Sequence, residues 1–168
     1  MADALQSALL VRIRIWLALF IAGLVLSGLT AFPLERETRI LDALFSVAPQ
    51  PPPTPEAPLK TWLRRVHQGI ASTNRAYPFM AYGTDWLGFA HLVIAIAFIG
   101  PSIDPVRNRW VLTFGVVACA AVPALAFIAG PIRGIPLYWR LIDSSFGIVG
   151  VVPLLFCLRY ARKLEELT

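Results

Sequence analysis

The chain has 168 residues, of which 57% are hydrophobic and 15% are charged. It is too apolar for a soluble domain and too long for a single membrane span, so the composition indicates a polytopic membrane protein. The formal net charge is +5, but the basic residues stand at the ends of apolar runs and in one loop. This distribution argues against a nucleic-acid-binding surface and favours membrane lipid as a partner.

The first apolar run follows a short polar start that contains Arg12 and Arg14. Residues 15–34 carry no charge and are numerous enough to cross the hydrocarbon core of a bilayer. A cleaved signal peptide is the alternative, but this run is longer than the apolar part of such a peptide, and the segment before it is long. We therefore expect the run to remain in the protein as its first span.

Residues 35–83 form a long connector of mixed character. Its middle, residues 49–58, is so rich in proline that we expect an extended spacer there. After the spacer, apolar and polar residues alternate at helical spacing. The apolar face comprises Leu59, Trp62, Leu63, Val66 and Ile70, and the polar face comprises Lys60, Arg64, Arg65 and Gln68. This pattern predicts an amphipathic helix that lies flat at the membrane interface.

Three further apolar runs predict spans over residues 84–103, 110–132 and 136–158. The turns between them are short and contain prolines, which favours tight hairpins. The predicted fold is an all-α, integral membrane four-helix bundle, with a single membrane domain over residues 1–168.

An even number of spans places both termini on one side of the membrane. Cytoplasmic termini would put many basic residues beside the cytoplasmic ends of the spans: Arg12, Arg14, Arg107, Arg109, Arg159, Arg162 and Lys163. The opposite side is also basic, but over a longer loop that carries acidic residues as well. We expect an integral protein of the bacterial inner (cytoplasmic) membrane with both termini cytoplasmic and the connector outside.

Two ionisable residues stand inside apolar runs, where they are unusual. At helical spacing, His91 shares a face with Gly88, and Asp143 shares a face with Gly147. Small residues allow helices to approach closely. We therefore predict that the glycine faces of the second and fourth spans meet, and that the His91 imidazole donates a hydrogen bond to the Asp143 carboxylate.

The depth of these two residues supports the same prediction. If Trp86 and Trp139 mark the outer interface, His91 and Asp143 both lie about 6 to 8 Å below it. Unpaired charges near that depth are costly, so we expect a charged rim above the pair. The rim would contain Asp85, Arg133 and Arg140.

This constellation has a structural and a functional interpretation. The structural one is that the polar residues only determine which helices pack together. In the functional one, Asp85, His91, Arg133, Arg140 and Asp143 are ligand-binding residues, and His91 and Asp143 are the candidates for catalysis. Arg133 and Arg140 would then hold a phosphate, and His91 would accept a proton.

Two functions follow from the functional interpretation. The first is a binding or accessory subunit with an outer-leaflet pocket for a lipid or quinone head group, assembled with other membrane subunits or with copies of itself. The alternative is an enzyme that acts on a lipid-linked phosphate or another lipid at the outer leaflet. The sequence leaves open whether the protein is an enzyme.

The remaining residues restrict the choice of cofactor. Quinone is compatible with a histidine and a carboxylate beside aromatic rings. Haem is disfavoured, because a b-type haem commonly takes two histidines from spans and the second histidine, His67, lies in the connector. We expect no metal site: no third ligand accompanies His91 and Asp143, and Cys119 and Cys157 lack the spacing of a metal or redox motif.

Overall fold

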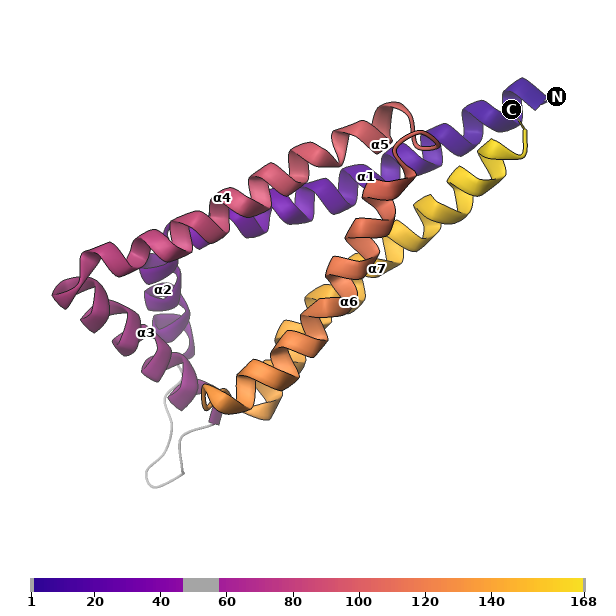
Figure 1. The fold of residues 1–168 in the computed structure, drawn as a ribbon. Coiled ribbons are helices and arrows are strands. Elements are labelled where there is room, and N and C mark those ends of the chain that lie inside the picture. Colours follow the sequence, from indigo (N-terminus) through magenta and orange to yellow (C-terminus); the bar gives the residue numbers. More distant parts are fainter. Residues whose placement is uncertain (1, 47–57, 168) are drawn as a thin grey trace. The chain divides into compact units, whose positions relative to one another are not determined.

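A computed structural model describes residues 2–46 and 58–167, which are almost entirely helical and contain no strand (Figure 1). Most of the expected spacer over residues 49–58 lies outside the described residues. The elements are α1 (Ala2–Ala31), α2 (Leu34–Ser46), α3 (Pro58–Ala76), the 3-10 helix η1 (Pro78–Ala81), α4 (Tyr82–Ala97), α5 (Ile99–Ile103), α6 (Arg109–Ile132) and α7 (Leu137–Glu165). The all-α fold class is confirmed.

Within the described residues, four helical segments are long and apolar enough to cross a membrane: Asp3–Ala31, Pro78–Ile103, Arg109–Ile132 and Leu137–Glu165. Large apolar side chains on all four are exposed, including Leu26, Ile96, Ile128 and Val149. So much exposed apolar surface on long helices is suited to contact with lipid rather than water. The chain is therefore a small polytopic membrane protein.

Helix α1 begins at Ala2, well before the predicted start of the first span at residue 15, because the segment before that residue has a buried face. Leu9, Ile13 and Leu17 recur every four residues and are at most 4% exposed. They fix α1 as one helix of 30 residues, about 45 Å long. The helix ends three residues before the predicted end of the span at residue 34. Pro33 has no N–H and disfavours a helical conformation at Phe32, so α1 stops at Ala31.

The second span is interrupted near its end, which the sequence analysis did not predict. A proline at position 101 offers no N–H to the carbonyl of Ala97, and its ring crowds that carbonyl. The chain therefore makes a tighter turn at Phe98, whose N–H donates to the Ala95 carbonyl at 3.2 Å. This turn places the Phe98 ring, 1% exposed, edge-on against Phe20 with 4.7 Å between ring centroids.

The turn between α5 and α6 is a tight hairpin, as predicted. The Asp104 carboxylate accepts a hydrogen bond from the Arg107 N–H at 3.0 Å. The Asn108 amide donates to the Gly100 and Asp104 carbonyls at 3.2 and 2.9 Å. These bonds satisfy backbone groups at a helix end, where the helix itself provides no partners.

The turn between α6 and α7 depends on one glycine. Gly134 has a φ of +67°, a conformation in which a residue without Cβ is unstrained. Its N–H donates to Pro131 at 3.1 Å, and the Ile135 N–H reaches back to Gly130 at 2.9 Å. This pair of bonds is a Schellman motif and ends α6 sharply. Pro136 then caps α7, which starts at Leu137.

The chain divides into two compact units. The terminal unit comprises Met1–Leu24 and Ile94–Thr168, and the connector unit comprises Val25–Val93. A single domain over the whole chain stays a prediction.

In the terminal unit, α6 and α7 run antiparallel and side by side (Figure 1). The core joins them to α1 and to the residue directly before α5, and it comprises Leu9, Ile13, Leu17, Phe98, Leu112, Leu154, Cys157, Ala161 and Leu164. Ala161 and Leu164 lie beyond the predicted end at residue 158, and their burial in this core explains why α7 continues to Glu165.

One end of the terminal unit brings the two chain termini together. The Gln6 amide donates to the Leu167 carbonyl at 3.0 Å, and the Arg109 guanidinium pairs with Glu165 at 2.9 Å. The Arg14 Nε also donates to the Ser102 carbonyl at 3.1 Å. The start of α1, the end of α7 and the α5–α6 turn therefore share one end of this unit, as four spans with co-located termini require.

The connector unit contains a close approach of two helix backbones. A Cβ atom added to Gly28 of α1 would lie 2.8 Å from the carbonyl oxygen of Gly88 in α4. A Cβ added to Gly88 would lie 2.7 Å from the carbonyl oxygen of Gly28. The approach is reciprocal, so neither helix has room for a side chain at this point.

Replacing Gly88 with alanine should destabilise the protein by about 1 to 3 kcal/mol, because the added methyl group would overlap the α1 backbone. Thermal unfolding in detergent measures this loss. Gly23→Ala in α1 is the matched control, because an added Cβ there meets nothing within 4 Å. Equal unfolding temperatures for the two variants would show that α1 and α4 do not touch at these glycines.

Reporter domains fused before residue 2 and after residue 167 should be found on the same side of the membrane, since Gln6 and Leu167 are hydrogen-bonded. Protease protection of the two fusions in sealed vesicles is the measurement. Protection of one fusion and digestion of the other would contradict the packing of the terminal unit.

Candidate functional site

His91 lies on the side of α4 that faces α1. A Cβ on Gly28 would lie 3.2 Å from the His91 Cβ, and the imidazole Nδ1 is 2.8 Å from the Leu87 carbonyl. A carbonyl can only accept, so Nδ1 carries the proton and donates. A neutral His91 then offers an acceptor at Nε2. Donation to a carboxylate, as the sequence analysis proposed, would require the imidazolium form.

The prediction that the glycine faces of the second and fourth spans meet is wrong. Each of these faces packs on a different helix. Gly88 is against α1, whereas a Cβ on Gly147 would overlap the Cys119 carbonyl and approach Val122 of α6. Each face is covered by a helix within its own unit. His91 belongs to the connector unit and Asp143 to the terminal unit, so their contact stays a prediction.

The predicted rim residues are likewise divided between the units. Arg133 caps α6 and is exposed. The aliphatic stem of Arg140 packs on Gly130, and its buried Nε makes no hydrogen bond to a described residue. Asp143 follows one turn later on α7 and is half-buried. Asp85 is half-buried in the first turn of α4, in the other unit.

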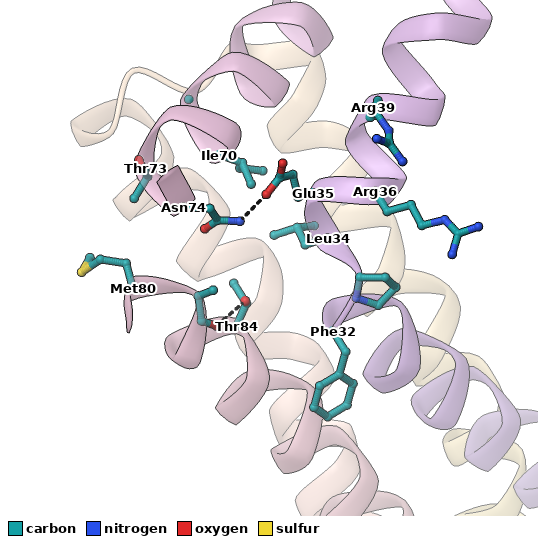
Figure 2. Close-up of a pocket in the computed structure, with 13 residues that line it drawn as sticks. Phe32, Leu34, Glu35, Arg36, Arg39, Ile70, Thr73, Asn74, Met80 and Thr84 are labelled. Carbon is teal, nitrogen blue, oxygen red and sulfur yellow. Dashed lines mark hydrogen bonds between the residues drawn. The ribbon is translucent and has the colours of Figure 1, made fainter. Parts of the chain in front are cut away.

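A cavity lies in the connector unit, in a place that the sequence pattern did not single out. It has a volume of about 590 Å³. Figure 2 draws the residues that line it. Its walls come from the turn after α1, from α2, α3 and η1, and from the start of α4. We call it the connector cavity. It is lined by Phe32, Pro33, Leu34, Glu35, Arg36, Arg39, Gly69, Ile70, Thr73, Asn74, Met80, Ala81 and Thr84.

One wall of the connector cavity is polar. The Asn74 side-chain amide of α3 donates to the Glu35 carboxylate of α2 at 2.8 Å, which joins the two helices across the cavity (Figure 2). The second carboxylate oxygen and the Asn74 carbonyl remain as acceptors. Thr73 contributes a hydroxyl, whereas the Thr84 hydroxyl is occupied by the Ala81 carbonyl at 2.7 Å. The wall therefore mainly offers hydrogen-bond acceptors.

The other walls are apolar or basic. Phe32, Leu34 and Ile70 provide apolar surface next to the ends of the spans. Arg36 and Arg39 extend from α2 at the edge of the cavity, on the side away from Asn74 (Figure 2). Both arginines are exposed and form no hydrogen bond or ion pair with any described residue. The cavity thus combines an acceptor wall, a cationic edge and an apolar base.

Packing between α2 and α3 shapes the cavity. Leu63 of the predicted interfacial helix is 4% exposed, and Thr38 of α2 is 7% exposed. The Thr38 hydroxyl donates to the Leu34 and Glu35 carbonyls at 3.0 and 3.1 Å and lies 3.4 Å from the Nδ1 atom of His67. His67 thus has a structural neighbour in α2, and it does not line the cavity.

Sequence reasoning missed this cavity because its residues are separated by the spacer and carry no motif. The available signal was the order of charges in α2: an acidic residue at 35 is followed by arginines at 36 and 39, which share one side of a helix. Asn74 gave no signal, because its contact with Glu35 spans 39 positions.

No group of three or more His, Cys, Asp or Glu side chains in residues 2–46 and 58–167 is placed to hold a metal ion. Both cysteines are free thiols. Cys157 is fully buried, with its sulfur 3.7 Å from the Ile13 carbonyl, which gives it a packing role between α7 and α1.

Comparison of the chain with protein-family models, curated proteins and solved structures finds no match in any of the three. The functional argument therefore depends on the chain's own residues.

Proposed function

We propose that the protein is a membrane binding or accessory protein that holds the polar head of a phospholipid in the connector cavity. The observation that carries the proposal is the combination, in one cavity of about 590 Å³, of an apolar base, an acceptor wall and two arginines without partners among the described residues. A phospholipid presents a complementary group for each: acyl chains for the apolar base, a phosphate for the arginines and a polar head with donors for the acceptor wall.

The position of the cavity along the chain supports this proposal. Phe32 directly follows the first span, and Met80 and Ala81 directly precede α4. The cavity is therefore at the ends of two apolar helices, where a bilayer has its head groups. Next to it, α2 exposes a row of apolar residues: Ile40, Leu41, Leu44 and Phe45. An amphipathic helix with such a face is suited to lie in the interface.

Each polar group of the cavity has a defined task in this proposal. Arg36 and Arg39 bind the lipid phosphate, for which guanidinium groups are well suited. The Glu35 carboxylate and the Asn74 carbonyl accept hydrogen bonds from hydroxyl or amino groups of the head. Phe32 and Ile70 contact the upper part of the acyl chains. A head group with donors, such as glycerol or ethanolamine, matches this arrangement.

A quinone matches the same walls less well. The arginines could donate to one of its carbonyl oxygens, but the Glu35–Asn74 wall mainly offers acceptors, for which a quinone has no donor. The described lining also contains neither histidine nor cysteine. These side chains favour binding over proton transfer or covalent catalysis, so we place binding ahead of an enzymatic role.

For orientation, we propose that the connector cavity faces the extracytoplasmic side of a bacterial inner membrane. The terminal unit brings both chain ends and the α5–α6 turn to one end. That end carries Arg12, Arg14, Arg107, Arg109, Arg159, Arg162 and Lys163. Basic residues beside span ends favour the cytoplasm, which leaves the connector, and the head group it binds, at the outer leaflet.

The double variant Arg36→Gln/Arg39→Gln should bind phosphatidylglycerol about three- to tenfold more weakly, since each exposed charge contact is worth a fraction of a kcal/mol to about 1 kcal/mol. Native mass spectrometry of the protein in a neutral sugar detergent, with short-chain phosphatidylglycerol added, gives the affinity. Glu35→Gln should also weaken binding, because a weaker acceptor then faces the head group.

Arg65→Gln is the matched control for this experiment. Arg65 is an exposed arginine on α3 of the same unit that does not line the cavity. An equal loss for Arg65→Gln and the double variant would mean that lipid responds only to the total positive charge, and the proposed site would be wrong. Binding of a short-chain quinone with unchanged phosphatidylglycerol affinity in the double variant would favour the quinone alternative.

A further inference from the structure

A second, smaller hollow in the connector unit is lined almost entirely by aromatic rings. It has a volume of about 300 Å³ and is lined by Phe32, Tyr82, Asp85, Trp86 and Phe89. We call it the aromatic pocket. Trp86 is the central ring: its centroid is 6.0 Å from that of Tyr82 and 5.7 Å from that of Phe89, at interplanar angles of 81° and 89°. The Tyr82 and Phe89 rings are each nearly perpendicular to Trp86, and all three rings line the pocket.

The pocket also contains one acidic side chain. Asp85 is half-buried, and its carboxylate makes no hydrogen bond or ion pair with any described residue. An ionised carboxylate among aromatic rings at the end of a membrane span is costly unless a cation is near. The pocket therefore offers a cation two kinds of partner: the Asp85 carboxylate and the aromatic π systems.

We propose that the aromatic pocket binds the trimethylammonium group of a choline lipid. Cation–π attraction suits a large, diffuse cation that has no N–H groups to satisfy. A primary ammonium would need several hydrogen-bond acceptors, whereas the Asp85 carboxylate is the acceptor side chain that the pocket offers apart from the Tyr82 hydroxyl. Aromatic rings and one carboxylate therefore select the quaternary over the primary amine.

Exposure of the rings points to a lipid rather than to a soluble cation as the source. Tyr82 is 62% exposed and Trp86 is 56% exposed, in the first turns of a span. Tyrosine and tryptophan at such positions lie at the level of the lipid head groups. A choline group carried by a lipid is concentrated in that layer, and its acyl chains can lie along the apolar surface of α4 below the pocket.

This site is chemically independent of the connector cavity. The two share Phe32, but the arginines and the Glu35–Asn74 pair belong to the cavity alone. One site can therefore fail a binding test while the other passes it.

Saturation-transfer NMR on the full chain in a neutral sugar detergent tests the proposal, with short-chain phosphatidylcholine as the probe. Saturation of protein aromatic protons should transfer to the trimethylammonium protons of the lipid. Asp85→Asn and Trp86→Leu should each weaken binding about three- to tenfold, as loss of the ion pair or of the best cation–π ring predicts.

Glu166→Gln and Trp110→Leu are the matched controls, because these two residues are exposed in other parts of the chain. Both controls should bind phosphatidylcholine as the unaltered protein does, and circular dichroism should show equal helix content in all variants. Equal losses in controls and pocket variants would overturn the proposal.

Two further ligands test whether binding requires the positive charge and whether the cation must be part of a lipid. A lipid whose trimethylammonium is replaced by the uncharged tert-butyl isostere should bind at least threefold more weakly. Equal binding of that isostere would show that the pocket is merely apolar and would refute the proposal. Free tetramethylammonium should compete weakly; competition at the same concentration as the lipid would refute a lipid source.

Discussion

The glycine contact between α1 and α4 is the constraint on which the connector unit depends. An α-proton of Gly28 is directed at the Gly88 carbonyl, and an α-proton of Gly88 is directed at the Gly28 carbonyl. Without side chains the backbones meet, so dispersion and weak Cα–H···O contacts act over a short distance. Inside a bilayer no hydrophobic effect drives helices together, and close packing of small residues is the main remaining source of helix association.

This contact fixes where the chain enters and leaves the connector. Gly28 is one turn before the end of α1, and Gly88 is less than two turns into α4. The two span ends are thereby held together, and α2, α3 and η1 must fold over them. Pro33 turns the chain directly after α1, and the Glu35–Asn74 hydrogen bond then ties α2 to α3. The connector cavity and the aromatic pocket both lie at this junction and share Phe32.

The sequence predicted the elements well and their partners poorly. The number of spans, the amphipathic α3 and the proline turns follow from local sequence patterns. Spans are easy to identify because a helix that crosses a bilayer needs a long apolar run. The early start of α1 was missed because Arg12 and Arg14 hid the buried series at 9, 13 and 17. Gly88 and Gly147 were correctly predicted to be packing positions. Periodicity does not say which helix covers each glycine, and the prediction that the two glycine faces meet was wrong. The cavity joins α2 and α3 across the spacer, a relationship that no local pattern encodes.

The central claim is that the α1 and α4 backbones touch at these two glycines and so hold the cavity together. The most direct measurement is proton-detected NMR of the labelled protein in lipid bilayers, with the α-protons of Gly28 and Gly88 assigned. The account predicts a cross-peak between those α-protons. If it is absent while cross-peaks between α6 and α7 protons are present in the same spectrum, the two helices do not meet there and the account is contradicted.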